Sequence, residues 1–272
     1  MPARLLTGVV LALALAGCSS GSGTSAPHSS PGPGESTPSV AETVAADPGQ
    51  RPEVGECHAL SWRQALAPEA QVDAVPCRKP HTAQTFVVGR LGLGAGAPAV
   101  DSARVQQRVQ RTCAERLPRH LGAPPRDLRL SMAQAVWFTP DVEQVAAGAN
   151  WFRCDVVVVA AQKELLRLPL RTKGWGRAPK IAMCATAEPG TKAFARVMCG
   201  STHSWVAIAT VDLPGARLPR PGQVRARMDP VCRGAARARA GDPLSFSWSQ
   251  ESPTQEQWDA GRRYGICWAP GS

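Results

Sequence analysis

The sequence lacks the long apolar runs of a polytopic membrane protein. No stretch of its 272 residues beyond the first 20 has 18 consecutive apolar positions, whereas a transmembrane helix needs about 20. Aromatic residues make up only 5% of the chain, and the 25 Gly and 25 Pro show no collagen period. With 43% hydrophobic residues, the chain is long enough for one or two domains with real cores.

Motifs of the common enzyme classes are also missing. The sequence has no Gly-x-Ser-x-Gly elbow, no His-Glu-x-x-His, no Ser-x-x-Lys with a downstream Ser-Asp-Asn, and no Walker loop. Carboxylates are few in the second half, and their spacing marks no glycosidase pair. We therefore expect a protein that is not an enzyme and that uses no cofactor.

The first residues predict an exported lipoprotein. One positive charge and a short apolar run lead directly to Leu15-Ala16-Gly17-Cys18, the pattern of a signal peptide (1–17) with a lipobox. Cys18 would carry a diacylglycerol with acyl chains such as palmitate, which holds the protein on the outer face of the cytoplasmic membrane. The alternative is an ordinary secretory signal with an incidental Cys. Residues 18–52, rich in Ser, Gly, Pro and Thr, are expected to form a disordered tether.

Eight cysteines remain when Cys18 is set aside, and an exported chain is expected to join them as disulfides. They form two sets of four with similar spacings: Cys57, Cys77, Cys113 and Cys154, then Cys184, Cys199, Cys232 and Cys267. Each set allows three pairings. We predict that the first Cys bonds the second and the third bonds the fourth, because this joins the start of each set to a strand and its helix to the final strand.

The sequence around the cysteines repeats as well. The second Cys of each set is followed four positions later by His81 or His203, and then by Thr or Ser. Alternating β-branched runs follow at 85–88 and 205–211 and predict strands. Two copies of one unit explain these matches.

Two helices and a last strand are predicted in each copy. The third Cys of each set lies in an apolar series of period four, which predicts a long helix with the Cys on its buried face. In the second copy Pro230 predicts either a kink or a helix that starts at Asp229 as N-cap. Further on, Thr139-Pro140 and Ser252-Pro253 each precede a Gly by eight residues. That spacing predicts a short helix with a hydroxyl N-cap and Pro at its first position.

The predicted fold class is therefore α+β, with two tandem disulfide-linked repeats at 53–165 and 180–269. Each repeat is expected to hold a small, mostly antiparallel sheet with one longer and one short helix. The last strand of each copy, at 151–160 and 264–268, carries its fourth Cys.

The first copy resembles a known family. Gly55-x-Cys57, Cys77-x2-Pro80-His81-Thr82, a helical Cys113, and the series Pro140, Gly148, Cys154 are similar to the septum formation-related domain of actinobacterial envelope proteins. The resemblance covers about residues 53–162, and the second copy is more divergent because it lacks the Gly before its first Cys and the Pro before its His. The resemblance implies a link to cell division and no known reaction.

The two repeated histidines have three interpretations. Together with Cys77 and Cys199 they would have the composition of a Cys2His2 zinc site, but disulfides compete for the same thiols, and we expect no metal. A structural role is favoured, in which each His bonds a backbone carbonyl or the neighbouring Thr82 or Ser204. A binding role is the third interpretation.

Charge marks a candidate binding surface in the second half. Residues 51–165 hold 14 basic and 11 acidic residues, whereas 166–272 hold 16 and 7. One acid, Asp229, accompanies seven arginines within 23 residues: Arg217, Arg220, Arg225, Arg227, Arg233, Arg237 and Arg239. The span is either a solvated helix face or a contact surface for anionic lipid headgroups or wall polymer. Nucleic acid is not expected outside the membrane.

The leading hypothesis is a membrane-anchored, non-enzymatic interaction or scaffold module of the cell envelope, with envelope or division proteins as partners. The alternative is a cell-wall-active hydrolase or transferase whose site the sequence does not reveal. A deep cleft with clustered carboxylates, or a His with a perturbed pKa, would favour the alternative.

Overall fold

The computed structural model describes residues 48–93, 99–175 and 181–271. The predicted signal peptide at 1–17, Cys18 and most of the predicted tether lie outside these ranges. Within them, no helix has both the length and the apolar character needed to cross a membrane.

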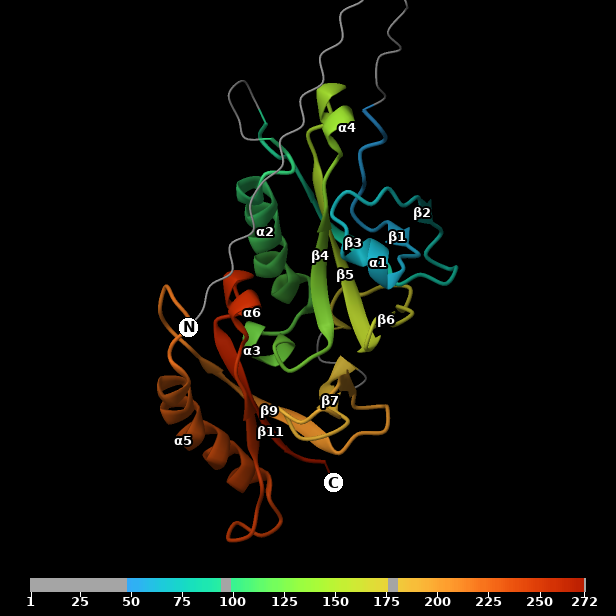
Figure 1. Ribbon diagram of the computed structural model, residues 1–272. Coiled ribbons are helices and arrows are strands. Elements are labelled where there is room, and N and C mark those ends of the chain that lie inside the picture. The colour runs from blue at the N-terminus through green and yellow to red at the C-terminus, as the bar shows by residue number, and fades with distance from the viewer. Residues whose placement is uncertain (1–47, 94–98, 176–180, 272) are drawn as a thin grey trace, which may run out of the picture. The chain divides into compact units, whose positions relative to one another are not determined.

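The protein is α+β with antiparallel sheets, and the first sheet has the strand order β2-β1-β3-β5-β4, with β6 paired to β5 (Figure 1). The long helix α2 packs against β4, β3 and β5. The strands are β1 (Cys57–His58), β2 (Ala74–Val75), β3 (Ala83–Gly89), β4 (Ala133–Phe138), β5 (Phe152–Ala161) and β6 (Glu164–Leu165), and the helices are α1 (Trp62–Ala65), α2 (Ala103–Leu121), α3 (Pro125–Leu128) and α4 (Val142–Ala146).

The second sheet has the order β8-β7-β9-β11-β10, which is the order of the first sheet when the strands are matched in chain sequence. Its long helix α5 packs against β9 and β11, as Figure 1 shows. The strands are β7 (Met183–Ala185), β8 (Arg196–Met198), β9 (Trp205–Asp212), β10 (Ser249–Glu251) and β11 (Tyr264–Pro270), and the helices are α5 (Pro221–Arg239) and α6 (Gln255–Asp259).

The long helices bury the predicted apolar series. In α2 the buried residues are Val105, Val109, Cys113, Leu117 and Leu121, and in α5 they are Val224, Met228, Cys232 and Ala236. Of the two arrangements predicted around Pro230, the start of the second helix at Asp229 was wrong. The helix begins at Pro221, because a proline fits the first helical position and the buried series already starts at Val224. Pro230 lies inside it on the exposed side.

The short helices begin later than predicted. The N-cap of α4 is Asp141 and that of α6 is Thr254, so Thr139 and Ser252 are not the caps. In both helices a Gln at the third position completes a capping box with the N-cap residue, which satisfies two backbone N–H groups at once. The predicted glycines past each end, Gly148 and Gly261, have φ of +104° and +95°, where a side chain would be strained.

The four disulfides have the predicted pairing. Each first bond joins the opening strand, β1 or β7, to the segment that follows the second strand, β2 or β8, and each second bond joins a long helix to the last long strand, β5 or β11. The bonds are Cys57–Cys77, Cys113–Cys154, Cys184–Cys199 and Cys232–Cys267, with Cα–Cα distances of 5.2, 5.4, 4.9 and 5.0 Å.

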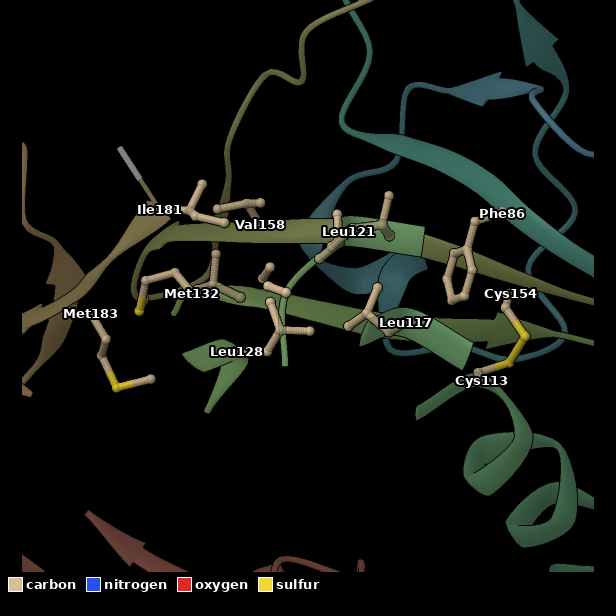
Figure 2. Close-up of a cluster of buried hydrophobic side chains, with 14 of the residues drawn as sticks. Phe86, Cys113, Leu117, Leu121, Leu128, Met132, Cys154, Val158, Ile181 and Met183 are labelled. Carbon is tan, nitrogen blue, oxygen red and sulfur yellow. A yellow bond between two sulfur atoms is a disulfide. The ribbon is translucent and has the colours of Figure 1, made fainter. Parts of the chain in front are cut away.

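One hydrophobic core continues from the first sheet into the second. Figure 2 shows Ile181 and Met183 beside Met132, Leu128 and Val158 of the first half. Backbone bonds accompany this packing, because the Met132 N–H donates to the Ile181 carbonyl at 2.7 Å and the Met183 N–H donates to that of Leu130 at 2.9 Å. The two sheets are therefore joined by a shared core in addition to the chain.

Candidate functional site

The two histidines singled out in the sequence lie just before β3 and β9. Nδ1 of His81 is 2.9 Å from the Lys79 carbonyl oxygen, and Nδ1 of His203 is 2.8 Å from that of Ser201. Each ring therefore donates to a backbone carbonyl two residues earlier, as the structural interpretation predicted. The Cys77 and Cys199 sulfurs are in disulfides, and no group of three metal-ligating side chains occurs in the described part of the chain.

The arginine-rich span lies before and along α5. All seven of its arginines are exposed, and within the described ranges none of them forms an ion pair. The guanidinium carbon of Arg233 lies 6.0 Å from the centre of the Trp248 ring. That of Arg237 lies 5.5 Å from the centre of the Phe246 ring. At the start of the helix a surface cavity of about 450 Å³ is lined by Arg217, Arg220 and Arg227, hereafter the α5 triad.

The matching helix of the first half is basic too. It carries five exposed arginines with one acid, Glu115: Arg104, Arg108, Arg111, Arg116 and Arg119. The second half therefore differs from the first less in its long helix than in Arg217 and Arg220, which precede α5, and in its smaller number of carboxylates.

A buried polar cluster lies where β1, β3 and β5 meet, on the face of β5 opposite to Cys154 and α2. Asp155 is fully buried and accepts a hydrogen bond of 2.7 Å from the Thr85 hydroxyl. Arg153, 5% exposed, places its Nε 3.3 Å from Asp155 Oδ2 and its Nη1 3.0 Å from His58 Nε2. Its guanidinium also lies 4.4 Å above the ring of Phe138.

The hydrogen bonds of His58 define its protonation. Its Nδ1 is 3.2 and 3.3 Å from the carbonyl oxygens of Val72 and Asp73, so Nδ1 carries the proton and Nε2 accepts from Arg153. Burial, and then the charge of Arg153, lower the pKa of His58 to about 4. His58 is therefore neutral at neutral pH.

The pKa of Asp155 is shifted in the opposite direction to that of His58. Burial raises its pKa to about 6, although the Arg153 charge and the Thr85 hydroxyl act against this shift. At neutral pH the cluster thus holds a buried Arg153–Asp155 ion pair, with a neutral His58 on the other side of the guanidinium.

A cavity of about 300 Å³ adjoins this cluster. His58 and Arg153 form part of its wall together with Trp151, Phe138 and Glu56. Arg153 Nη2 and Trp151 Nε1 are buried and have no hydrogen-bond partner among the described residues. Other atoms of these two side chains line the cavity, whereas the two donor atoms themselves are shielded from it.

The second sheet fills the matching positions with apolar side chains. The corresponding positions of the two sheets follow from aligning their cysteines and their repeated histidines. The strand register agrees with this alignment, because Thr85 lies opposite Asp155 in the first sheet and Ala207 lies opposite Trp268 in the second. His58, Thr85, Arg153 and Asp155 correspond to Ala185, Ala207, Ile266 and Trp268, all of them buried in the hydrophobic core. The sheet itself therefore does not require the polar cluster.

A family model described as septum formation matches residues 54–267, most of the chain. The chain belongs to the septum formation family. This match connects it with septum formation, as the resemblance of the first copy implied. No curated protein matches the chain, and no solved structure does.

Sequence reasoning missed the polar cluster of this septum formation protein. His81 and His203 stand out in the sequence because the pattern around them repeats, whereas His58, Arg153 and Asp155 have no polar equivalents in the second sheet. One signal was available, because Arg153 and Asp155 flank Cys154 in a strand that continues as four valines. Charges in a strand buried on both faces are rare unless paired.

Proposed function

We propose that this protein is a lipid-anchored, non-enzymatic interaction module on the outer face of the cytoplasmic membrane that contributes to septum formation. The lipobox at Cys18 supports the anchor, and the four disulfides fit an oxidising compartment. The observation that carries the proposal is the exposed arginine surface of α5.

The two sheets are copies of one unit in this proposal. Support comes from their equal strand order, from the matching disulfides and from the capping boxes of α4 and α6. In the first copy the cavity beside Arg153 is kept polar, whereas the second copy has an apolar interior there. The copies are therefore specialised differently, and the second supplies the basic contact surface.

The arginine surface binds an anionic partner, either lipid headgroups or wall polymer. Its charges are not neutralised by neighbouring carboxylates within the described residues, so they remain available to a partner. Basic residues near an anionic membrane contribute about 1 kcal/mol each. The α5 triad would then contribute about 3 kcal/mol, which is about 100-fold in affinity.

Vesicle binding tests this surface. A Cys18→Ala chain, which has no lipid anchor, is measured on vesicles with and without anionic lipid and on isolated wall polymer, at low and high salt. Replacing the α5 triad by Gln should lower binding about 100-fold, and added salt should weaken wild-type binding because exposed charges are screened over about 8 Å at physiological ionic strength.

The matched control replaces three exposed arginines of α2 by Gln: Arg104, Arg111 and Arg116. This variant changes the net charge by the same amount but should lower binding much less. Equal losses in both variants, or binding that salt does not change, would refute the assignment of the surface to α5.

The alternative of a wall-active hydrolase or transferase has one observation in its favour. His58 has a perturbed pKa and lines a cavity with the Glu56 carboxylate. However, both ring nitrogens of His58 are engaged inside the protein, and a pKa of about 4 makes it a weak general base at neutral pH. Release of soluble fragments from wall polymer that His58→Gln and Glu56→Gln abolish would favour the enzyme.

A further inference from the structure

The loop that follows α5 carries a leucine with almost its whole side chain in solvent. Leu244 is 96% exposed, whereas the other exposed large hydrophobic side chains of the described residues reach at most 65%, at Val54. The loop joins α5 to β10 and projects past the lower end of α5 in Figure 1. A leucine stabilises a fold through its burial, so the folded core gives no reason for a leucine at this position.

Local hydrogen bonds hold Leu244 at the tip of this loop. Asp242-Pro243-Leu244-Ser245 form a turn, with Asp at its first position and Pro at its second, where both residue types are favoured. The Leu244 N–H donates to Asp242 Oδ1 at 2.9 Å, and the Ser245 N–H donates to the Asp242 carbonyl at 3.2 Å. Turns are usually made of Gly, Pro, Asn, Asp and Ser. This turn instead presents an apolar side chain to the solvent from a hydrogen-bonded backbone.

Two exposed arginines in the last turn of α5 lie beside the loop. The guanidinium carbon of Arg237 is 5.5 Å from the centre of the Phe246 ring. Arg239 lines a surface cavity of about 400 Å³ together with Ser245 and Phe246. The loop has one acid, Asp242, and its carboxylate already accepts from the Leu244 N–H. The end of α5 therefore combines an apolar tip with basic residues next to it.

This combination matches the surface of an anionic membrane better than that of a wall polymer. Arginines interact with anionic lipid headgroups, and apolar side chains gain free energy by entering the boundary between headgroups and acyl chains. An anionic wall polymer would attract the arginines equally but has no apolar layer for a leucine to enter.

We propose that the turn at Leu244 inserts into the outer surface of the cytoplasmic membrane, with Arg237 and Arg239 at the level of the headgroups. This inference rests on the proposed anionic contact of α5, and it names the lipid bilayer as the partner. Residues 18–48 can extend to about 100 Å, so an anchor at Cys18 leaves the loop free to reach the same membrane.

The test compares the Cys18→Ala chain with two further variants of that chain, Leu244→Ser and Leu66→Ser. Leu66 is the matched control, because it is 63% exposed and lies in the first half, at the end of α1. Binding is measured on phosphatidylcholine vesicles with and without phosphatidylglycerol and on isolated wall polymer, at low and high salt.

Leu244→Ser should weaken binding to the anionic vesicles about tenfold and leave binding to wall polymer unchanged. Leu66→Ser should change neither. The tenfold difference should persist at high salt, because salt screens the arginines but not the burial of apolar surface.

A second measurement locates the side chain in the bilayer. Lipids with brominated acyl chains quench the emission of an indole that enters the apolar layer. They should therefore quench Leu244→Trp more strongly than the parent chain with its native tryptophans, whereas Leu66→Trp should show no added quenching.

Equal vesicle binding of Leu244→Ser and its parent, or no added quenching in Leu244→Trp, would overturn the insertion. A loss of binding in the α5 triad variant would in that case leave the arginine surface in place. Binding to wall polymer without binding to vesicles would overturn the lipid assignment alone. Failure of the proposed function has a different result, because the α5 triad variant would then bind vesicles and polymer as well as its parent does.

Discussion

Replacing His58 by Gln should change how the free energy of unfolding depends on pH. The Gln amide can still donate to the Val72 or Asp73 carbonyl and accept from Arg153, but it does not titrate. The pKa of His58 falls from 6.5 in the unfolded chain to about 4 in the folded protein. Between these values the unfolded chain binds more protons, so the His58 contribution to stability is lost as the pH falls from 6.5 to 4.

The expected size follows from the shift. A pKa shift of one unit corresponds to about 1.4 kcal/mol, so His58 contributes about 3 kcal/mol near pH 7 that disappears near pH 4. Asp155 acts in the opposite direction, because its pKa rises from 3.8 to about 6 on folding. Its ionisation costs the folded state stability as the pH rises from 3.8 to 6, again by about 3 kcal/mol. In the wild-type protein the two contributions largely cancel.

Urea unfolding of the disulfide-bonded protein, from about pH 4 to about pH 7, measures these contributions. The stability difference between wild type and His58→Gln should change by about 3 kcal/mol in favour of wild type as the pH rises. The difference between wild type and Asp155→Asn should change by a similar amount in the opposite direction. Differences that do not vary with pH, or that vary with the same sign for both variants, would refute the reasoning.

Three further predictions concern covalent links and the buried ion pair. Removal of the Cys113–Cys154 disulfide by a double Ala substitution should lower the free energy of unfolding by about 4 kcal/mol, and removal of Cys184–Cys199 should lower it by about 3 kcal/mol. The first disulfide costs more because it closes a loop of 41 residues, whereas the second closes one of 15. Equal losses in urea unfolding would contradict this. A chain with Cys18→Ala should partition into the aqueous phase in detergent extraction with unchanged thermal unfolding, and retention at the membrane would count against the lipobox. Replacing Arg153 and Asp155 together by Met and Val should leave stability unchanged or higher, whereas Asp155→Val alone should cost about 3–5 kcal/mol, a contrast that thermal or urea unfolding checks.

Periodicity and cysteine spacing predicted most of the fold. The strands β3, β5, β9 and β11, the buried faces of α2 and α5, and all four disulfides follow from local patterns that tertiary packing did not override. The starts of the short helices were missed by two residues. Asp141 and Thr254 are good N-cap residues too, as are the hydroxyl residues before Pro140 and Pro253. The helices start at Asp141 and Thr254 because a Gln three residues after each completes a capping box.

No comparable sequence pattern predicts how the two sheets pack together or where the polar cluster forms. The contact of Ile181 and Met183 with Met132 depends on chain segments about 50 residues apart, and no local sequence pattern predicts it. His58 gains its environment from Arg153, 95 residues away. In the sequence it is one His after a Cys, with no spacing that marks it.

The two sheets fill the positions of the polar cluster with different kinds of side chain. A buried ion pair is seldom more stabilising than well-packed apolar side chains of similar volume, and the second sheet holds Ile266 and Trp268 at the positions of Arg153 and Asp155. Stability of the sheet is therefore a poor reason for burying these charges in the first sheet. Because His58 and Arg153 line a cavity of about 300 Å³, the burial of these polar groups is better explained by a role of that cavity than by the stability of the sheet.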